Sequence, residues 1–291
     1  MMTEVLGKWR IGGKTMPELP EVETVVRGLR ASGLAGRTIR AVHVRWSGAI
    51  EAPSAAEFVK ALKGERVAEI ARRGKYIVIR LGGGRHVLIH LRMTGRLRLV
   101  AASLPIEKHE HIILDLDDGS QLRYRDPRKF GRWCVPEDVA VRLGRLGPEP
   151  LDASFTAESF EERLRSRQGM LKPLLLNQSF VAGLGNIYVD EALWEAGLHP
   201  RRKSGTLTKA ERRRLHGAIR VVLRRGILNR GTTLGRGSTN FQGIGGERGS
   251  NQRGLNVFRR TGEPCPRCGT PIVRLIVSQR STHVCTRCQR G

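Results

Sequence analysis

The sequence lacks any apolar run long enough to span a membrane. Its longest uncharged stretch, residues 173–189, is interrupted by Asn177, Gln178 and two glycines, and it falls short of the roughly 20 apolar residues that a membrane helix needs. Residues 1–15 carry charges at four positions and have no apolar core, so they do not form a secretory signal. We therefore expect a cytoplasmic protein that does not associate with a membrane.

Acidic and aromatic residues are both scarce. Asp and Glu number 27 against 52 Lys and Arg, a formal charge of +25, and only 5% of the residues are aromatic. The basic residues occur along the whole chain, and the hydrophobic content of 39% is sufficient for packed cores, which argues against a disordered basic tail. The composition favours a polyanionic partner, most simply nucleic acid. Nothing in the sequence indicates an oligomer, so we expect a monomer.

Cysteine is also rare, with five in 291 residues. Cys134 stands alone in an apolar strand-like segment and is predicted to be a buried, reduced thiol. The others form two C-x-x-C pairs separated by sixteen residues, a spacing typical of a zinc ribbon with a hairpin between the pairs. Four thiolates leave no open coordination position, so the predicted single zinc ion is structural. The predicted metal ligands are Cys265, Cys268, Cys285 and Cys288.

The rest of the chain divides into regions where the sequence changes between strand-like, helical and glycine-rich patterns. Residues 16–145 begin with a helix that ends near Gly33 and continue as short β-branched segments, with a hairpin turn at residues 117–119 and a helix at residues 55–62. They predict a β-sandwich with flanking helices. Residues 146–154 form a linker, residues 155–235 are helical, residues 236–260 form a glycine-rich loop, and residues 261–291 form the finger. The predicted fold class is therefore multidomain α+β.

The helical region contains two recognisable helix starts. Thr208 and Glu211 have the spacing of a capping box. Asn186 follows two glycines and is predicted to cap a helix whose N-terminus points outward as a phosphate-binding site. An ordinary glycine turn between packed helices explains the same residues.

The segment MPELPEVETV begins at Met16. If translation starts at Met16 and the methionine is removed, Pro17 becomes the N-terminus with a free secondary amine. An α-amine has a pKa of about 7.7–8.0 against about 10.4 for lysine, so it is the better nucleophile at neutral pH. Residues 1–15 would block this amine in a peptide bond, so we expect them to be an extension or the product of a misassigned start.

Several long motifs together resemble one family. They are MPELPEVETV, RRGKYIVI, HLRMTG, KHEH, RYRDPRKFG, LGPEPL, NQSFVAGLGNIYVDEALWEAGLHP, GTTL, GEPCPRCGTPI and QRSTHVCTRCQ. From Met16 to the end, in this order, they resemble the bacterial formamidopyrimidine-DNA glycosylases. The resemblance implies a β-sandwich, a helix-two-turns-helix domain and a zinc finger around a DNA cleft. It also implies excision of 8-oxoguanine and formamidopyrimidines from double-stranded DNA, then β,δ-elimination at the abasic site, as part of base-excision repair at the bacterial nucleoid.

The resemblance assigns catalytic roles to four residues. Pro17 would attack the anomeric carbon and form a Schiff base, and Glu18 would act as general acid. Lys75 would contact the lesion phosphate and assist proton transfer, and Arg280 would hold the phosphates of the extruded nucleotide and help the δ-elimination. Glu21 matches another family position, although a charge at a helix N-terminus explains it equally well.

Base excision requires the base to be flipped out of the duplex. By resemblance, Met93, Arg128 and Phe130 form a wedge that fills the gap, with the arginine reading the opposite cytosine. Four further residues match phosphate-contacting positions: His109, Arg167, Lys172 and Asn186. Taken singly, each of these side chains is more typical of a core or a solvated surface.

The glycine-rich loop departs from the family pattern. Asn251 stands where relatives carry an aromatic residue, and Phe258 and Arg259 stand where a Tyr-Gly pair is usual. Lesion preference is therefore open.

Two alternatives to an 8-oxoguanine glycosylase remain. One is a non-catalytic damaged-DNA-binding protein whose N-terminal extension has disabled the nucleophile. A second is a glycosylase for oxidised pyrimidines, as in the sister endonuclease VIII group.

Overall fold

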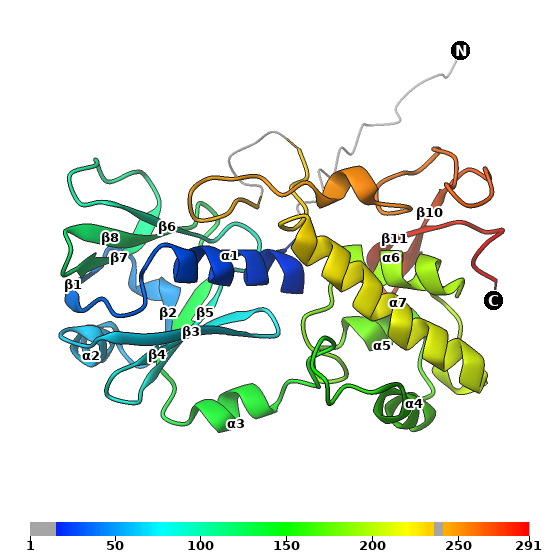
Figure 1. The fold of residues 1–291 in the computed structure, drawn as a ribbon, viewed down its shortest axis with the longest axis horizontal. Helices are drawn as coiled ribbons and strands as arrows, with labels where there is room; N and C mark the ends of the chain where they lie inside the picture. The colour runs from blue at the N-terminus through cyan, green and yellow to red at the C-terminus, as the bar shows by residue number, and fades with distance from the viewer. Residues whose placement is uncertain (1–15, 236–240, 291) are drawn as a thin grey trace, which may run out of the picture.

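The computed structural model describes residues 16–235 and 241–290. Residues 1–15, for which we predicted an extension, lie outside the described residues, as do residues 236–240 of the predicted loop. A strand-rich lobe and a helical lobe lie side by side, and the finger packs on the helical lobe (Figure 1). In the described part of the chain, no helix is both long and apolar enough to cross a membrane.

The first lobe is the predicted β-sandwich. One sheet has the strand order β1-β7-β8-β6 and the other β2-β9-β5-β4-β3, and side chains from both sheets share one buried apolar cluster. The predicted turn joins β7 to β8, with Gly119 at a φ of 79° that favours glycine. The strands are β1 (Ile39–Val44), β2 (Ile50–Ala52), β3 (Val67–Arg73), β4 (Tyr76–Leu81), β5 (His86–His90), β6 (Arg96–Ala101), β7 (Glu110–Leu116), β8 (Ser120–Arg125) and β9 (Arg132–Cys134).

Three helices accompany the sandwich: α1 (Leu19–Ala31), α2 (Ala55–Leu62) and α3 (Val139–Gly144). The α2 helix forms where predicted, because Ser54 and Glu57 complete a capping box. The α1 helix belongs to both lobes, since Leu19 packs in the helical core while Val22 and Val26 pack in the sandwich core. The free thiol of Cys134 is buried on β9, as predicted.

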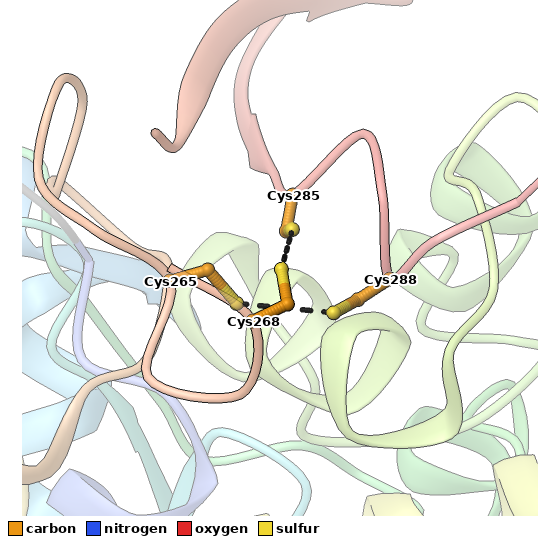
Figure 2. A group of neighbouring side chains, drawn as sticks. All are labelled: Cys265, Cys268, Cys285 and Cys288. Atoms are coloured by element: carbon orange, nitrogen blue, oxygen red, sulfur yellow. Dashed lines mark hydrogen bonds between the residues drawn. The ribbon is translucent and has the colours of Figure 1, made fainter. Parts of the chain in front are cut away.

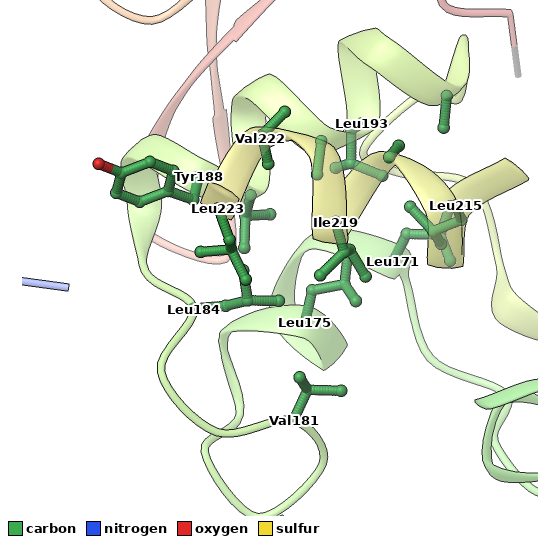
Figure 3. Packing of buried hydrophobic residues seen from close by; sticks show 14 of the residues in the cluster. Leu171, Leu175, Val181, Leu184, Tyr188, Leu193, Leu215, Ile219, Val222 and Leu223 are labelled. Atoms are coloured by element: carbon green, nitrogen blue, oxygen red, sulfur yellow. The ribbon is translucent and has the colours of Figure 1, made fainter. Parts of the chain in front are cut away.

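The second lobe consists of α4 (Ala157–Arg165), α5 (Leu171–Leu176), α6 (Asn186–Ala196) and α7 (Lys209–Leu228). The predicted capping box of Thr208 and Glu211 starts α7. Leu193, Ile219 and Leu223 pack between α6 and α7 (Figure 3).

The finger contains one antiparallel hairpin, β10 (Val273–Val277) and β11 (Arg280–Val284). It packs on α6 through Trp194 and Ile272. Short 3-10 helices lie at Ser47–Ala49, Ser204–Thr206 and Asn251–Gly254. The order of sandwich, helical lobe and finger agrees with the predicted fold class.

Candidate functional site

A cleft of about 1180 Å³ is lined by residues from both lobes and the finger. Its walls therefore come from segments far apart in the sequence. The predicted site residues among its lining are Glu18, Lys75, Met93, Phe130, Asn186 and Arg280.

The Glu18 carboxylate is buried at the N-terminus of α6. Its oxygens accept hydrogen bonds from the backbone N–H groups of Ile187 (2.9 Å) and Tyr188 (3.3 Å). A Cβ on Gly185 would lie 2.3 Å from the Glu18 carboxyl carbon, so glycine is required for this close approach. Burial raises the pKa of Glu18, although the Lys75 charge and the α6 N–H groups oppose the shift. A raised pKa favours the protonated form that a general acid needs.

Glu21 lies beside Glu18 in the same buried region. It accepts hydrogen bonds from the Tyr188 hydroxyl (2.8 Å), the Thr232 N–H (2.6 Å) and the Glu18 N–H (2.9 Å). Burial and the neighbouring Glu18 charge raise the pKa of Glu21 to about 7. Glu21 therefore links α1 to α6 and to the chain after α7.

Lys75 stands in the turn between β3 and β4 and is only 5% exposed. Burial lowers its pKa, and the charges of Arg280 and Arg92 add to this, while the carboxylates of Glu18 and Glu21 oppose it. A buried lysine beside buried carboxyl groups can exchange protons with them or bind an anion in the cleft. Pro17 is buried next to Glu18 in the chain, and Met16 lines the cleft.

The three predicted wedge residues lie together. An Nη1 of Arg128 is 3.5 Å from the Met93 sulfur, and its guanidinium lies 4.5 Å from the centre of the Phe130 ring. Phe130 is 44% exposed, which leaves its ring available for a contact outside the protein. Arg92 and Lys129, the neighbours of the wedge residues in sequence, have φ angles of 52° and 59°. Such strain in non-glycine residues is typical of functional loops.

Arg280 is exposed at the start of β11, and its neighbour Ser281 is fixed to the helical lobe. The Ser281 carbonyl accepts hydrogen bonds from the Lys172 ammonium and the Asn186 amide, both at 2.9 Å. Asn186 is the first residue of α6, and the N-cap is Gly185. The prediction that Asn186 is the N-cap was therefore wrong by one residue, because its side chain reaches across to the finger.

The predicted phosphate contacts differ in their surroundings. His109 is partly exposed beside the wedge, and desolvation followed by the charges of Lys108 and Arg125 lowers its pKa. Arg167 is exposed after α4. Lys172 is completely buried, and its ammonium donates to Asp190 at 2.6 Å, so in this structure its direct partners are protein groups.

The four predicted metal ligands converge (Figure 2). Their sulfur atoms all lie within 4.8 Å of one another, and the Sγ separations are 3.9 Å for Cys265 and Cys288 and 3.4 Å for Cys268 and Cys285. A tetrahedral zinc site with Zn–S bonds of about 2.3 Å places its sulfurs about 3.8 Å apart. The donor set fits one structural zinc ion.

Three family models match the chain. They are the formamidopyrimidine-DNA glycosylase N-terminal domain at residues 16–133, the formamidopyrimidine-DNA glycosylase H2TH domain at residues 146–237, and the zinc finger found in FPG and IleRS at residues 262–291. The chain belongs to the formamidopyrimidine-DNA glycosylase family.

Similar proteins span nearly the same residues. The chain is 47% identical to the formamidopyrimidine-DNA glycosylase of Protochlamydia amoebophila and 46% identical to that of Herpetosiphon aurantiacus, in each case over 94% of this chain and 100% of the relative. Among solved structures it resembles a variant of Lactococcus lactis FPG bound to DNA that contains Fapy-dG. That match has a TM-score of 0.87 and 36% identity, and it covers 94% of this chain and 100% of the other.

Of the three residues that depart from the family pattern, Asn251 and Phe258 have local packing partners, whereas Arg259 lines the cleft. Asn251 is buried, and its amide donates to the Thr232 hydroxyl at 2.9 Å and to the Tyr188 hydroxyl at 3.4 Å, which joins it to the Glu21 network. Phe258 packs its ring against His283 with centres 5.0 Å apart. Asn251 is buried inside the helical lobe, while Phe258 packs on the core of that lobe and also lines the cleft.

Other residues of this glycosylase site escaped sequence reasoning. Asp190 binds Lys172 and also accepts from the His283 N–H at 2.9 Å. Asp126 is completely buried and accepts hydrogen bonds from the Thr94 hydroxyl and the Phe130 N–H. These donors lie in the two loops that carry the predicted wedge residues, called here the wedge loops. Burial, with the charges of Arg92 and Lys75, lowers the pKa of His90 to about 3. For Asp190 and His90 the available signal was a polar residue within a helix or strand segment expected to be buried, whereas Asp126 follows β8 and had no such signal.

Proposed function

We propose that this glycosylase removes oxidised purines, such as 8-oxoguanine and formamidopyrimidines, from duplex DNA and then cleaves the strand at the abasic site. As a member of its family it is a base-excision-repair DNA glycosylase with lyase activity. The observation that carries the proposal is the buried Glu18 carboxyl group, which lies beside Pro17 and shares the cleft with Lys75 and Arg280. Because the substrate is chromosomal DNA, we propose that it acts in the cytoplasm at the nucleoid.

The proposed chemistry uses the nitrogen of Pro17. Its lone pair forms a bond to C1′ of the extruded nucleotide, and the bond between C1′ and the base breaks with its electron pair leaving on the base. The bonded nitrogen loses its N–H proton, the departing base takes up a proton, and Glu18 supplies a proton to the sugar ring oxygen, so the C1′–O bond breaks, the ring opens and a cationic iminium forms. That cation accepts electrons as the Glu18 carboxylate takes a proton first from C2′ and then from C4′, and these β- and δ-eliminations break the C3′–O and C5′–O bonds. Lys75 and Arg280 hold the phosphates that depart.

This chemistry requires a free amine at Pro17, because an amide nitrogen cannot form a Schiff base. The N-terminal family model begins at residue 16, and the relatives align over their full length with 94% of this chain. We therefore propose that the active form lacks residues 1–15 and has lost Met16, so that it begins at Pro17.

Two forms of the protein test the nucleophile, one beginning at Pro17 and one retaining residues 1–16. Each is incubated with an 8-oxoguanine:cytosine duplex and borohydride, which reduces a Schiff base to a stable adduct. We expect only the form with free Pro17 to form the adduct and cut the strand. Pro17→Gly, which keeps a terminal amine, is the matched control. Equal trapping by the longer form would refute the assignment.

The alternatives need separate tests. A damaged-DNA-binding protein whose N-terminal extension has disabled the nucleophile would, when purified from its own host, retain residues 1–16, bind the duplex and leave it uncut, and N-terminal sequencing of that material decides. A pyrimidine-specific enzyme would cut a thymine glycol duplex faster than the 8-oxoguanine duplex.

A further inference from the structure

Trp46 lies just after β1 among cations of the wedge region. The Lys129 ammonium is 5.0 Å and the Arg132 guanidinium 5.7 Å from the centre of the indole ring. Both distances fall within the roughly 6 Å range of cation–π attraction. His111 packs against the same ring with centres 5.1 Å apart. Lys129 stands between the wedge residues in sequence, so this cluster adjoins the wedge directly.

The position of the indole is fixed by its surroundings. A Cβ on Gly48 would lie 2.5 Å from the Trp46 ring, so the ring rests against the backbone of the following turn. Lys129 is held by its own backbone, since its N–H donates to the Asp126 carbonyl at 3.1 Å. Arg132 donates to the carbonyls of Lys129 (3.0 Å) and Gly131 (2.8 Å). The two cations are thus placed by the ring and by neutral backbone groups.

Carboxylates neutralise other cations of the same lobe but not these two. Arg123 pairs with Glu110 at 3.3 Å, and Arg125 pairs with Glu107 at 3.6 Å. Among residues 16–235 and 241–290, no carboxylate lies within 4.0 Å of the Lys129 ammonium or the Arg132 guanidinium. The cations around Trp46 therefore keep their charge available for an external anion, and Arg132 also lines the cleft.

We propose that Trp46, Lys129 and Arg132 form a phosphate-binding surface that holds the DNA backbone beside the wedge, with Trp46 as the positioning residue. This surface, called here the Trp46 surface, deepens the proposed function and rests on it. Lys129 and Arg132 contact phosphates, and the indole ring restricts both cations to positions facing the duplex. The surface would hold the backbone in register while the wedge residues occupy the gap left by the extruded base.

Salt dependence of DNA binding tests the surface, because each phosphate contact contributes about 0.9 to the slope of log K against log salt concentration. The probe is a duplex containing a tetrahydrofuran abasic analogue. Lys129→Gln should reduce the slope by about 0.9. Trp46→Leu should reduce the slope by at least as much, since it releases both cations, while Trp46→Phe should retain most of the wild-type slope because it preserves an aromatic face.

Two controls separate positioning from general damage to the fold. Lys63→Gln makes the same charge change beside the far end of β1, where Gly64 bonds to Ile39, and it should leave the slope unchanged. In the double variant Trp46→Leu with Lys129→Gln, the two losses should be less than additive, because both act on the same ammonium. Thermal unfolding of every variant shows whether the fold is intact.

A folded Trp46→Leu variant with the wild-type slope would overturn the positioning role, and a wild-type slope for Lys129→Gln would overturn the phosphate contact. A Lys63→Gln slope equal to that of Lys129→Gln would also refute the surface, since any cation would then serve. The proposed function fails separately, if the form beginning at Pro17 leaves an 8-oxoguanine duplex uncut whatever the slopes.

Discussion

Replacing Asp126 with alanine would remove the acceptor that joins the two wedge loops. One carboxylate oxygen accepts from the N–H groups of Phe130 (2.8 Å) and Gly131 (2.7 Å) and from the Tyr124 hydroxyl (3.1 Å). The other accepts from the Arg128 N–H at 3.2 Å and from the Thr94 hydroxyl. Asp126 itself has no exposed surface, so water does not readily take its place.

The expected cost follows from the donors left without a partner. Each buried unsatisfied donor costs about 1–3 kcal/mol. The bonds from the Gly131 N–H and the Tyr124 hydroxyl are both buried, so losing them should lower the free energy of unfolding by about 2–6 kcal/mol. This is a large part of a typical total of about 5–15 kcal/mol. Asp126→Asn keeps one acceptor oxygen but turns an NH₂ toward a donor, so we expect a loss of roughly 1–3 kcal/mol.

Urea unfolding of the three proteins measures these differences, and single-turnover cutting of an 8-oxoguanine duplex reports on the wedge. Asp138→Ala is the matched control, because Asp138 accepts two backbone N–H groups at the exposed start of α3 and its loss should cost about 1 kcal/mol. If Asp126→Ala unfolded within about 0.5 kcal/mol of wild type, the reasoning from unpaired donors would be refuted.

Two further predictions concern the metal and pH. Cys285→Ser should lower the zinc content from one ion per chain and weaken DNA binding, because the finger loses a thiolate ligand. Metal analysis and a DNA-binding titration measure these two effects. An unchanged zinc content would contradict the prediction. Glu21, with its pKa raised from 4.5 to about 7, holds a proton in the folded state that the unfolded chain releases. Stability should therefore fall by about 1.4 kcal/mol per pH unit between those values. The urea midpoint of Glu21→Gln should vary less across this pH range than the midpoint of the wild-type protein. Parallel plots of midpoint against pH for the two proteins would refute the raised pKa of Glu21.

Local features of the fold were predictable because their contacts span few residues. Ser54 with Glu57, and Thr208 with Glu211, form their capping boxes across three positions, and the turn at Gly119 needs only its own φ. The zinc ligands were predictable from the spacing of two short motifs. The proposed catalytic and wedge residues came from family resemblance, since a single lysine or methionine carries no local signal of its role.

Long-range pairings were not predictable in this way. Glu18 bonds to Ile187, 169 positions away, and no periodicity records that partner. The buried pair of Lys172 and Asp190 was missed because lysine is usually exposed, and only the packed junction of α5, α6 and the finger supplies its counter-charge. The same junction diverts the Asn186 side chain from capping its own helix.

The seating of Glu18 on the first turn of α6 has a consequence during synthesis on the ribosome. A nascent chain that has emerged only as far as the sandwich contains Pro17 and Glu18, the proposed nucleophile and acid, but lacks α6, whose N–H groups bind the Glu18 carboxylate. Arg280, near the other end of the chain, arrives later still. An incomplete polypeptide therefore lacks part of the proposed site, and we expect DNA cleavage only from the complete chain.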